Sequence, residues 1–126
     1  MSQLVRPSTA FSTRRQKRPR QHHDGHLAWL RTLPSLVPGI EPVEAAHIRY
    51  GDRRYAKPET GMGEKSSDNW AVPLSADIHR LQHSMGEREF WSEQGIDPIV
   101  VAAFLWAHSG DDEAGATIIR NARKLT

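Results

Sequence analysis

The sequence predicts an α+β fold in which two short strands precede a group of packed helices. Two brief apolar segments, residues 43–48 and 70–74, are separated by a long polar loop and bounded by turn-forming residues, as short strands are. After residue 75 the chain carries several helix start and stop signals. Its 126 residues are the length of a single domain.

The basic residues are concentrated near the N-terminus. Residues 1–25 contain six arginines and lysines against one aspartate, whereas the remainder contains 11 basic and 14 acidic residues. Because only 37% of the chain is hydrophobic, we expect residues 1–25 to be a disordered basic tail and residues 26–126 to form one domain. Such a tail favours an anionic partner such as DNA, which it would contact through Arg14, Arg15, Lys17, Arg18 and Arg20. A solubilising tail and a mitochondrial transit peptide share this composition.

Composition also excludes several classes of protein. The chain has no cysteine, so it contains neither disulfides nor a zinc site built from thiolates. Histidine, with seven residues, is the plentiful nitrogen ligand for a metal. No apolar run approaches the roughly 18 residues of a membrane span, so we expect a cytoplasmic protein without a membrane partner.

The first half of the domain reads as short extended segments and loops. Weak alternation of Leu27, Trp29 and Leu33 favours a strand or extended segment that begins near His26. Prolines stiffen residues 34–42 into a loop before the strand at 43–48. Pro73 breaks the brief strand at 70–74, and a proline there is restricted to an edge or an end of a strand.

The loop at residues 50–67 is long and basic, with a Gly-x-Gly turn. Its cationic side chains either follow a phosphate backbone or form a solvated surface; they are Arg53, Arg54, Lys57 and Lys65.

Four helices are expected after the second strand. Ser75 is a candidate N-cap for a helix that ends near Met85, before Gly86, with Ile78 and Leu81 facing the core. Further helices are expected at residues 87–94, 97–108 and 111–125. The 97–108 helix is apolar nearly all round, so either this domain or a partner must bury it.

Three histidines form the central hypothesis about function. His79 and His83 are one helical turn apart and share a face, which suits two ligands of one divalent metal ion. His47, at the end of the first strand, would act as a general base toward a water aimed at phosphorus. Asp68 or Asn69 would position this base or complete the metal shell, and Arg49 would hold a phosphate oxygen. Isolated histidines are more often surface or core residues, and Arg49 can instead pair with Glu44 or Asp68.

These segments resemble the HNH nuclease motif, most closely that of the small HNH nucleases carried by bacteriophages and prophages. The resemblance covers about residues 27–107, and its motifs are Ala46-His47-Ile48-Arg49, Gly61-x-Gly63-x-Lys65-x-x-Asp68, Val72-Pro73-Leu74 and Ile78-His79-x-x-x-His83. It implies a ββα-metal (treble-clef-like) finger at residues 26–85, followed by a helical part at residues 86–126. It also implies metal-dependent cleavage of DNA with one divalent ion, of which Mg²⁺, Mn²⁺, Ni²⁺ and Zn²⁺ are candidates.

The chain departs from this family pattern at two places. The cysteine pairs that usually bind a structural zinc are replaced, at matching positions, by Ser35, Pro38, Ser75 and Ile78. We therefore expect no structural zinc, and the C-terminal helices must compensate for its stabilising effect. Many HNH proteins place an acidic metal ligand before the base histidine, where this chain has Ala46.

Two further functions compete with the nuclease. The replaced zinc positions and Ala46 are also typical of a catalytically silent derivative that binds DNA or protein. Alternatively, the apolar 97–108 helix would make the chain an interaction protein that associates with itself.

Overall fold

The computed structural model describes residues 22–60 and 66–125 and is a mixed α+β structure. Within these residues five α-helices accompany a two-stranded antiparallel sheet, so the expected α+β class is confirmed. In chain order the elements are α2 (Asp24–Leu30), β1 (Val43–His47), the 3₁₀-helix η2 (Arg53–Tyr55), β2 (Ala71–Ser75), α3 (Ala76–Met85), α4 (Glu87–Gln94), α5 (Pro98–Ala107), α6 (Asp112–Arg120) and the 3₁₀-helix η3 (Ala122–Lys124).

The sheet register places Val43 opposite Ser75 at one end and His47 opposite Ala71 at the other. Pro73 lies opposite Ala45, and its carbonyl accepts from the backbone N–H of Leu36 on the outer side of β2, at 2.8 Å. The proline nitrogen faces that same outer side, so the missing N–H removes no hydrogen bond between the strands. Pro73 is the middle residue of β2, so the expected break there is wrong, whereas its place on an edge strand agrees with the two-stranded sheet.

The segment after His23 is a helix, so the expected strand or extended segment from residue 26 is wrong. Nδ1 of His23 accepts from the backbone N–H of His26 at 2.9 Å and caps α2, which begins at Asp24. The buried side chains in and after the helix follow a helical period and include a histidine; they are His26, Leu27, Trp29, Leu30 and Leu33. Histidine is usually a polar residue in hydropathy patterns, so the apolar residues alone do not show this helical period.

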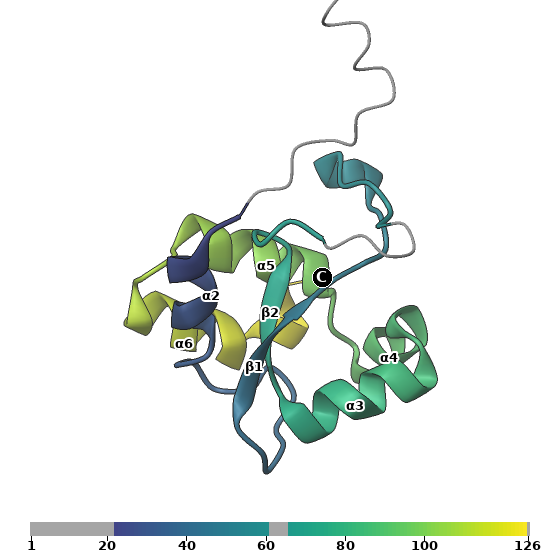
Figure 1. Cartoon of the computed structure of the whole chain (residues 1–126), viewed down its shortest axis with the longest axis horizontal. Coiled ribbons are helices and arrows are strands. Elements are labelled where there is room, and N and C mark those ends of the chain that lie inside the picture. The colour runs from purple at the N-terminus through teal and green to yellow at the C-terminus, as the bar shows by residue number, and fades with distance from the viewer. Residues whose placement is uncertain (1–21, 61–65, 126) are drawn as a thin grey trace, which may run out of the picture.

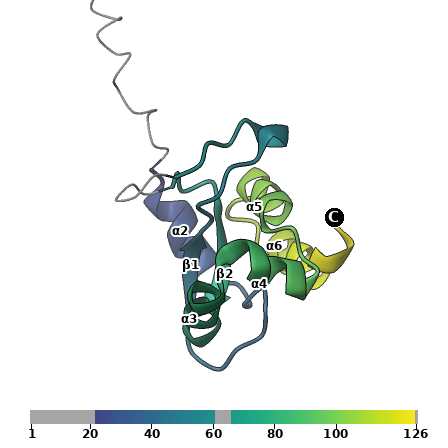
Figure 2. The ribbon, with the colours of Figure 1, turned by 90° about the vertical axis from the view of Figure 1, so that its right-hand side faces the viewer.

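Helices cover the sheet on more than one side (Figures 1 and 2). Helix α5 packs against β2, and α2 and α3 each pack against both strands, so every residue of β2 is buried. Both views place η2 and α3 at opposite ends of the molecule, with the sheet between them. The sheet therefore lies between two separate regions of the molecule, one near η2 and one near α3.

Several helix boundaries follow the expected capping residues, but Ser75 makes no side-chain capping hydrogen bond, and the last helix ends at Arg120 rather than near residue 125. Helix α3 ends before Gly86, which has a positive φ of 98°, and the carboxylate of Asp97 accepts from the backbone at the start of α5. On α3 one expectation is wrong: Leu81 is 46% exposed, whereas the neighbouring Gln82 is buried. Helix α3 packs against both strands and α4, and the exposed Leu81 is not part of the core that they form.

Helix α5 is mostly buried by its own domain. Its core side chains include Ile99, Val101 and Leu105, and Phe104 is its exposed large apolar residue. Within residues 22–60 and 66–125, no helix has both the length and the apolar character needed to cross a bilayer.

Candidate functional site

His47 and Asp68 form a hydrogen-bonded pair at the end of β1. Nε2 of His47 lies 2.8 Å from Oδ1 of Asp68. The histidine side chain is 26% exposed, whereas the aspartate side chain is fully buried. Because a carboxylate only accepts, Nε2 carries the proton, and in the neutral ring Nδ1 keeps a lone pair. This geometry holds an accessible imidazole in one orientation.

The N-terminal end of the described chain anchors Asp68 from the other side. Its Oδ2 accepts from the backbone N–H of His23 at 2.7 Å, and Nδ1 of His22 lies 3.5 Å from the same atom. A long-range contact of this kind has no local sequence signal, so His22 and His23 were not among the expected members of the site. The other ring contacts here are local or structural, because His23 Nδ1 caps α2 and His26 Nδ1 contacts the hydroxyl of Ser109.

His79 and His83 lie together on α3, as their spacing predicts. Their Nε2 atoms are 3.2 Å apart, and their ring centroids are separated by 4.7 Å. Two imidazole nitrogens bound to one tetrahedral ion at about 2.1 Å lie about 3.4 Å apart, so the observed pair has the spacing of two ligands of one metal. The pair can equally share a proton in an N–H···N hydrogen bond.

Glu44 joins this pair from β1. Its Oε1 accepts from Nδ1 of His79 at 2.8 Å. An acidic residue inside an otherwise apolar strand, three residues before His47, is the sequence signal that could have identified it.

The His47–Asp68 pair and the His79–His83 pair lie near different ends of β1, because His79 contacts β1 through Glu44. Glu44 pairs with Leu74 and His47 with Ala71 in the register, which separates the two along β1 by roughly 10 Å. In a regular strand, residues three apart also face opposite sides. Among the described residues, no group of three or more histidines, cysteines, aspartates or glutamates could hold a metal. The structure therefore brings the expected residues together as two pairs.

Arg49 lies near the start of α4. Its backbone N–H donates to the carboxylate of Glu87, at 3.1 and 3.2 Å. Burial raises the pKa of Glu87, while Lys57, His83 and Arg49 are the nearby charges that lower it. Glu87 is therefore a carboxylate neighbour of Arg49 that the sequence did not indicate.

Asn69 does not share the contacts of Asp68. Its side-chain oxygen is buried and has no hydrogen-bond partner among the described residues. Asp68, rather than Asn69, is thus the residue of this pair that orients His47.

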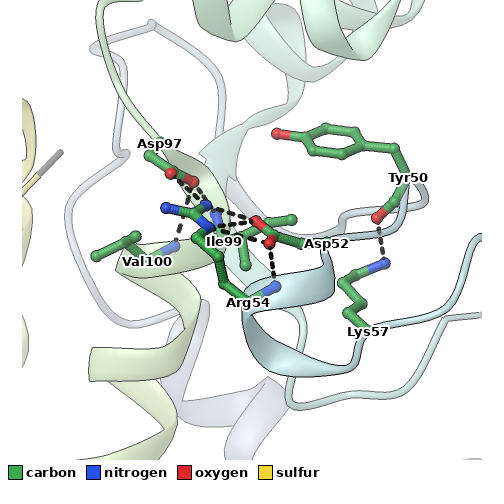
Figure 3. A network of polar contacts seen from close by, with 7 residues as sticks. All are labelled: Tyr50, Asp52, Arg54, Lys57, Asp97, Ile99 and Val100. Carbon is green, nitrogen blue, oxygen red and sulfur yellow. Dashed lines mark hydrogen bonds and ion pairs between the residues drawn. The ribbon is translucent and has the colours of Figure 1, made fainter.

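Two basic residues of the 50–67 loop have structural contacts. Arg54 binds the carboxylates of Asp52 and Asp97, the latter at 2.6 Å, and so ties η2 to the N-cap of α5 (Figure 3). Nζ of Lys57 donates to the carbonyl of Tyr50 at 2.6 Å, and burial lowers its pKa. Arg53 is exposed.

Six of the basic residues expected to bind nucleic acid cannot be placed, because Lys65 and the five tail residues between 14 and 20 lie outside the described residues.

Ser35 and Ser75, two of the four residues matched to the zinc-binding cysteines, belong to a hydrogen-bonded cluster. The backbone N–H of Ser75 donates to Oγ of Ser35 at 2.8 Å, and Oγ of Ser75 donates to Asp77 at 2.6 Å. Asp77 also accepts from backbone N–H groups of the 34–42 loop, and the serine hydrogen bond is the largest cause that lowers its pKa to about 2. A Cβ on Gly39 would lie 2.4 Å from the Ser75 hydroxyl, so the loop approaches α3 closely.

Comparisons of this chain with protein-family models, with curated proteins and with solved structures each gave no match.

Proposed function

We propose that this chain hydrolyses phosphodiester bonds of DNA with one divalent metal ion, in the manner of an HNH nuclease. The observation that carries the proposal is the hydrogen bond between His47 and the buried Asp68, at 2.8 Å. A partly exposed imidazole held by a buried carboxylate is the arrangement of a general base. The order of β1, β2 and α3, with a histidine pair on the helix, is consistent with a ββα-metal finger.

In this proposal His79 and His83 hold the metal ion through Nε2. Two protein ligands leave the remaining coordination positions to water and to phosphate oxygens, as in catalytic rather than structural sites. When bound, the ion supplies positive charge to the phosphorane oxygens and the leaving oxygen. No structural zinc is part of the proposal, because hydrogen bonds of Ser35, Ser75 and Asp77 join the loop to α3.

His47 performs the proton transfer. Asp68 keeps the proton of the neutral ring on Nε2, so Nδ1 accepts a proton from the attacking water. The water oxygen forms a bond to phosphorus as the bond from phosphorus to the leaving sugar oxygen breaks. Arg49 holds a non-bridging oxygen of the phosphate, and the exposed Arg53 lies along the adjoining DNA, whereas Arg54 is held by Asp52 and Asp97.

Nicking of supercoiled plasmid with Mg²⁺, Mn²⁺, Ni²⁺ or Zn²⁺ tests the proposal. We expect His47→Ala to lower the rate by about 10²–10⁴-fold, because general-base catalysis contributes this much. Asp68→Asn should lower it less, since the imidazole remains and the amide oxygen can still accept from Nε2, but the negative charge that stabilises the protonated ring is lost. His108→Ala is the control, because that exposed histidine contacts the backbone of its own helix. Absence of nicking with every metal, or equal nicking by His47→Ala, would contradict the proposal.

A second candidate is a silent derivative of the same fold that binds DNA without cleaving it. The observation that favours it is the absence, among the described residues, of a group of three metal-binding side chains around His79 and His83. This candidate predicts salt-sensitive DNA binding with no nicking under any of the four metals. The plasmid assay and a binding assay on the same preparation therefore separate the two.

A further inference from the structure

We infer that Glu44 is a positioning residue for the metal site, which sets the proton and the orientation of His79. The inference rests on the proposed function. It concerns a residue of β1 that is neither a metal ligand nor part of the His47 pair.

The geometry assigns the roles of the two ring nitrogens of His79. Oε1 of Glu44 lies 2.8 Å from Nδ1, and a carboxylate only accepts hydrogen bonds, so Nδ1 carries the proton. In the neutral ring, Nε2 then keeps its lone pair. This is the atom that lies 3.2 Å from Nε2 of His83, so the lone pair is directed to the place where the two histidines meet.

Such a contact affects metal binding for two physical reasons. It orients the ring before the ion arrives, and the negative charge of the carboxylate raises the basicity of the ligating nitrogen. Removal of a carboxylate in this position typically weakens metal binding about 10–100-fold. With two protein ligands, the orientation of each ring contributes a large share of the affinity.

The same strand-to-helix interface offers a matched control. Glu41 precedes β1 and binds Arg80, the neighbour of His79 on α3, with two hydrogen bonds of 2.9 Å. Glu41→Gln therefore removes one carboxylate charge from the same region and leaves the contact between Glu44 and His79 in place. A general electrostatic effect would appear in both variants, and a positioning effect in Glu44 variants alone.

The experiment is calorimetric titration of the untagged full-length chain with Co²⁺, with the visible cobalt absorption as a second readout. His79→Ala and His83→Ala identify the binding that belongs to this site. We expect Glu44→Ala to weaken that binding about 10–100-fold and Glu44→Gln less, because the amide oxygen still accepts from Nδ1. Glu41→Gln should stay within about twofold of wild type. Glu44 is 52% exposed, so these variants should fold, and their thermal midpoints without metal should match wild type.

The outcomes distinguish this inference from the proposed function. Binding through the two histidines that is unchanged in Glu44→Ala and Glu44→Gln would overturn the role of Glu44 and leave the metal site intact. Equal weakening by Glu41→Gln would also overturn it, because the effect would then be general electrostatics. If the wild type binds no Co²⁺, or binds it equally in the His79 and His83 variants, the proposed metal site fails and the inference fails with it.

Discussion

His26 shows how a single residue can couple folding to pH. Its side chain is fully buried against the rings of Trp29 and Trp106, with ring centroids 5.8 and 4.9 Å away. Nδ1 contacts the hydroxyl of Ser109 at 2.7 Å, while Nε2 is buried without a hydrogen-bond partner among the described residues. Burial, with a smaller effect of the charge on His23, lowers the pKa of His26 to about 4.

A pKa below the ordinary value means that the unfolded chain binds the proton more tightly than the folded chain. Stability is therefore complete above the unfolded pKa of about 6.5 and falls as the pH decreases toward 4. We expect the free energy of unfolding to drop by about 2 kcal/mol between pH 7 and pH 5 through this residue. Urea unfolding at the two pH values measures the drop.

The control for this prediction is His26→Phe, which keeps an aromatic ring in the cavity and cannot take up a proton. Its free energy of unfolding should change much less between pH 7 and pH 5. An equal change in the variant and the wild type would assign the pH dependence to other groups.

At the scale of elements, the contact between α2 and α6 depends on one glycine. Gly115 is buried in α6, and a Cβ added there would lie 2.8 Å from the ring of Trp29 and 3.0 Å from Leu33. Nε1 of the same tryptophan donates to Asp112 in the first turn of α6, at 2.8 Å. The hydrogen bond and the close packing together set the distance between the helices.

Gly115→Ala should destabilise the protein although alanine favours helices. The added methyl group must displace a tryptophan ring held by a hydrogen bond, and overpacking of this kind costs about 1–3 kcal/mol. Most of this range exceeds the gain of about 1 kcal/mol in helix propensity. Urea unfolding measures the balance, with exposed Glu113→Ala as the control on the same helix. A variant more stable than wild type would show that α2 and α6 can separate without cost.

At the scale of the whole molecule, charge divides the chain into a basic N-terminal segment and the rest. Removal of residues 1–21 deletes six arginines and lysines and keeps His22 and His23, which contact Asp68. We expect this deletion to weaken the binding of DNA to a similar extent whatever the DNA sequence. The slope of log affinity against log salt should flatten by about 0.9 for each phosphate that the shortened protein no longer neutralises. Fluorescence anisotropy at several salt concentrations measures the slope, and an unchanged slope would exclude the segment from binding.

Local signals accounted for most of the helices and both strands. Asp97 followed by proline, the glycines that end α3 and α4, and the apolar run of β2 act within a few residues, so they can be read without the fold. Helix α2 was missed because its period includes a histidine whose burial is a tertiary property. Leu81 was misplaced because the face that α3 presents to the sheet depends on its packing.

In the candidate site, too, some features follow from local sequence and others only from the fold. The spacing of His79 and His83 and the position of His47 at a strand end follow from helix and strand geometry, so the sequence by itself determined them, with the α+β class. Only the tertiary structure decided that Asp68 orients His47, that Glu44 contacts His79, and that Arg54 binds Asp97. These partners are 21, 35 and 43 residues apart in the chain. Contacts over such separations depend on how β1, β2 and the helices pack, and no local pattern of residues encodes that packing.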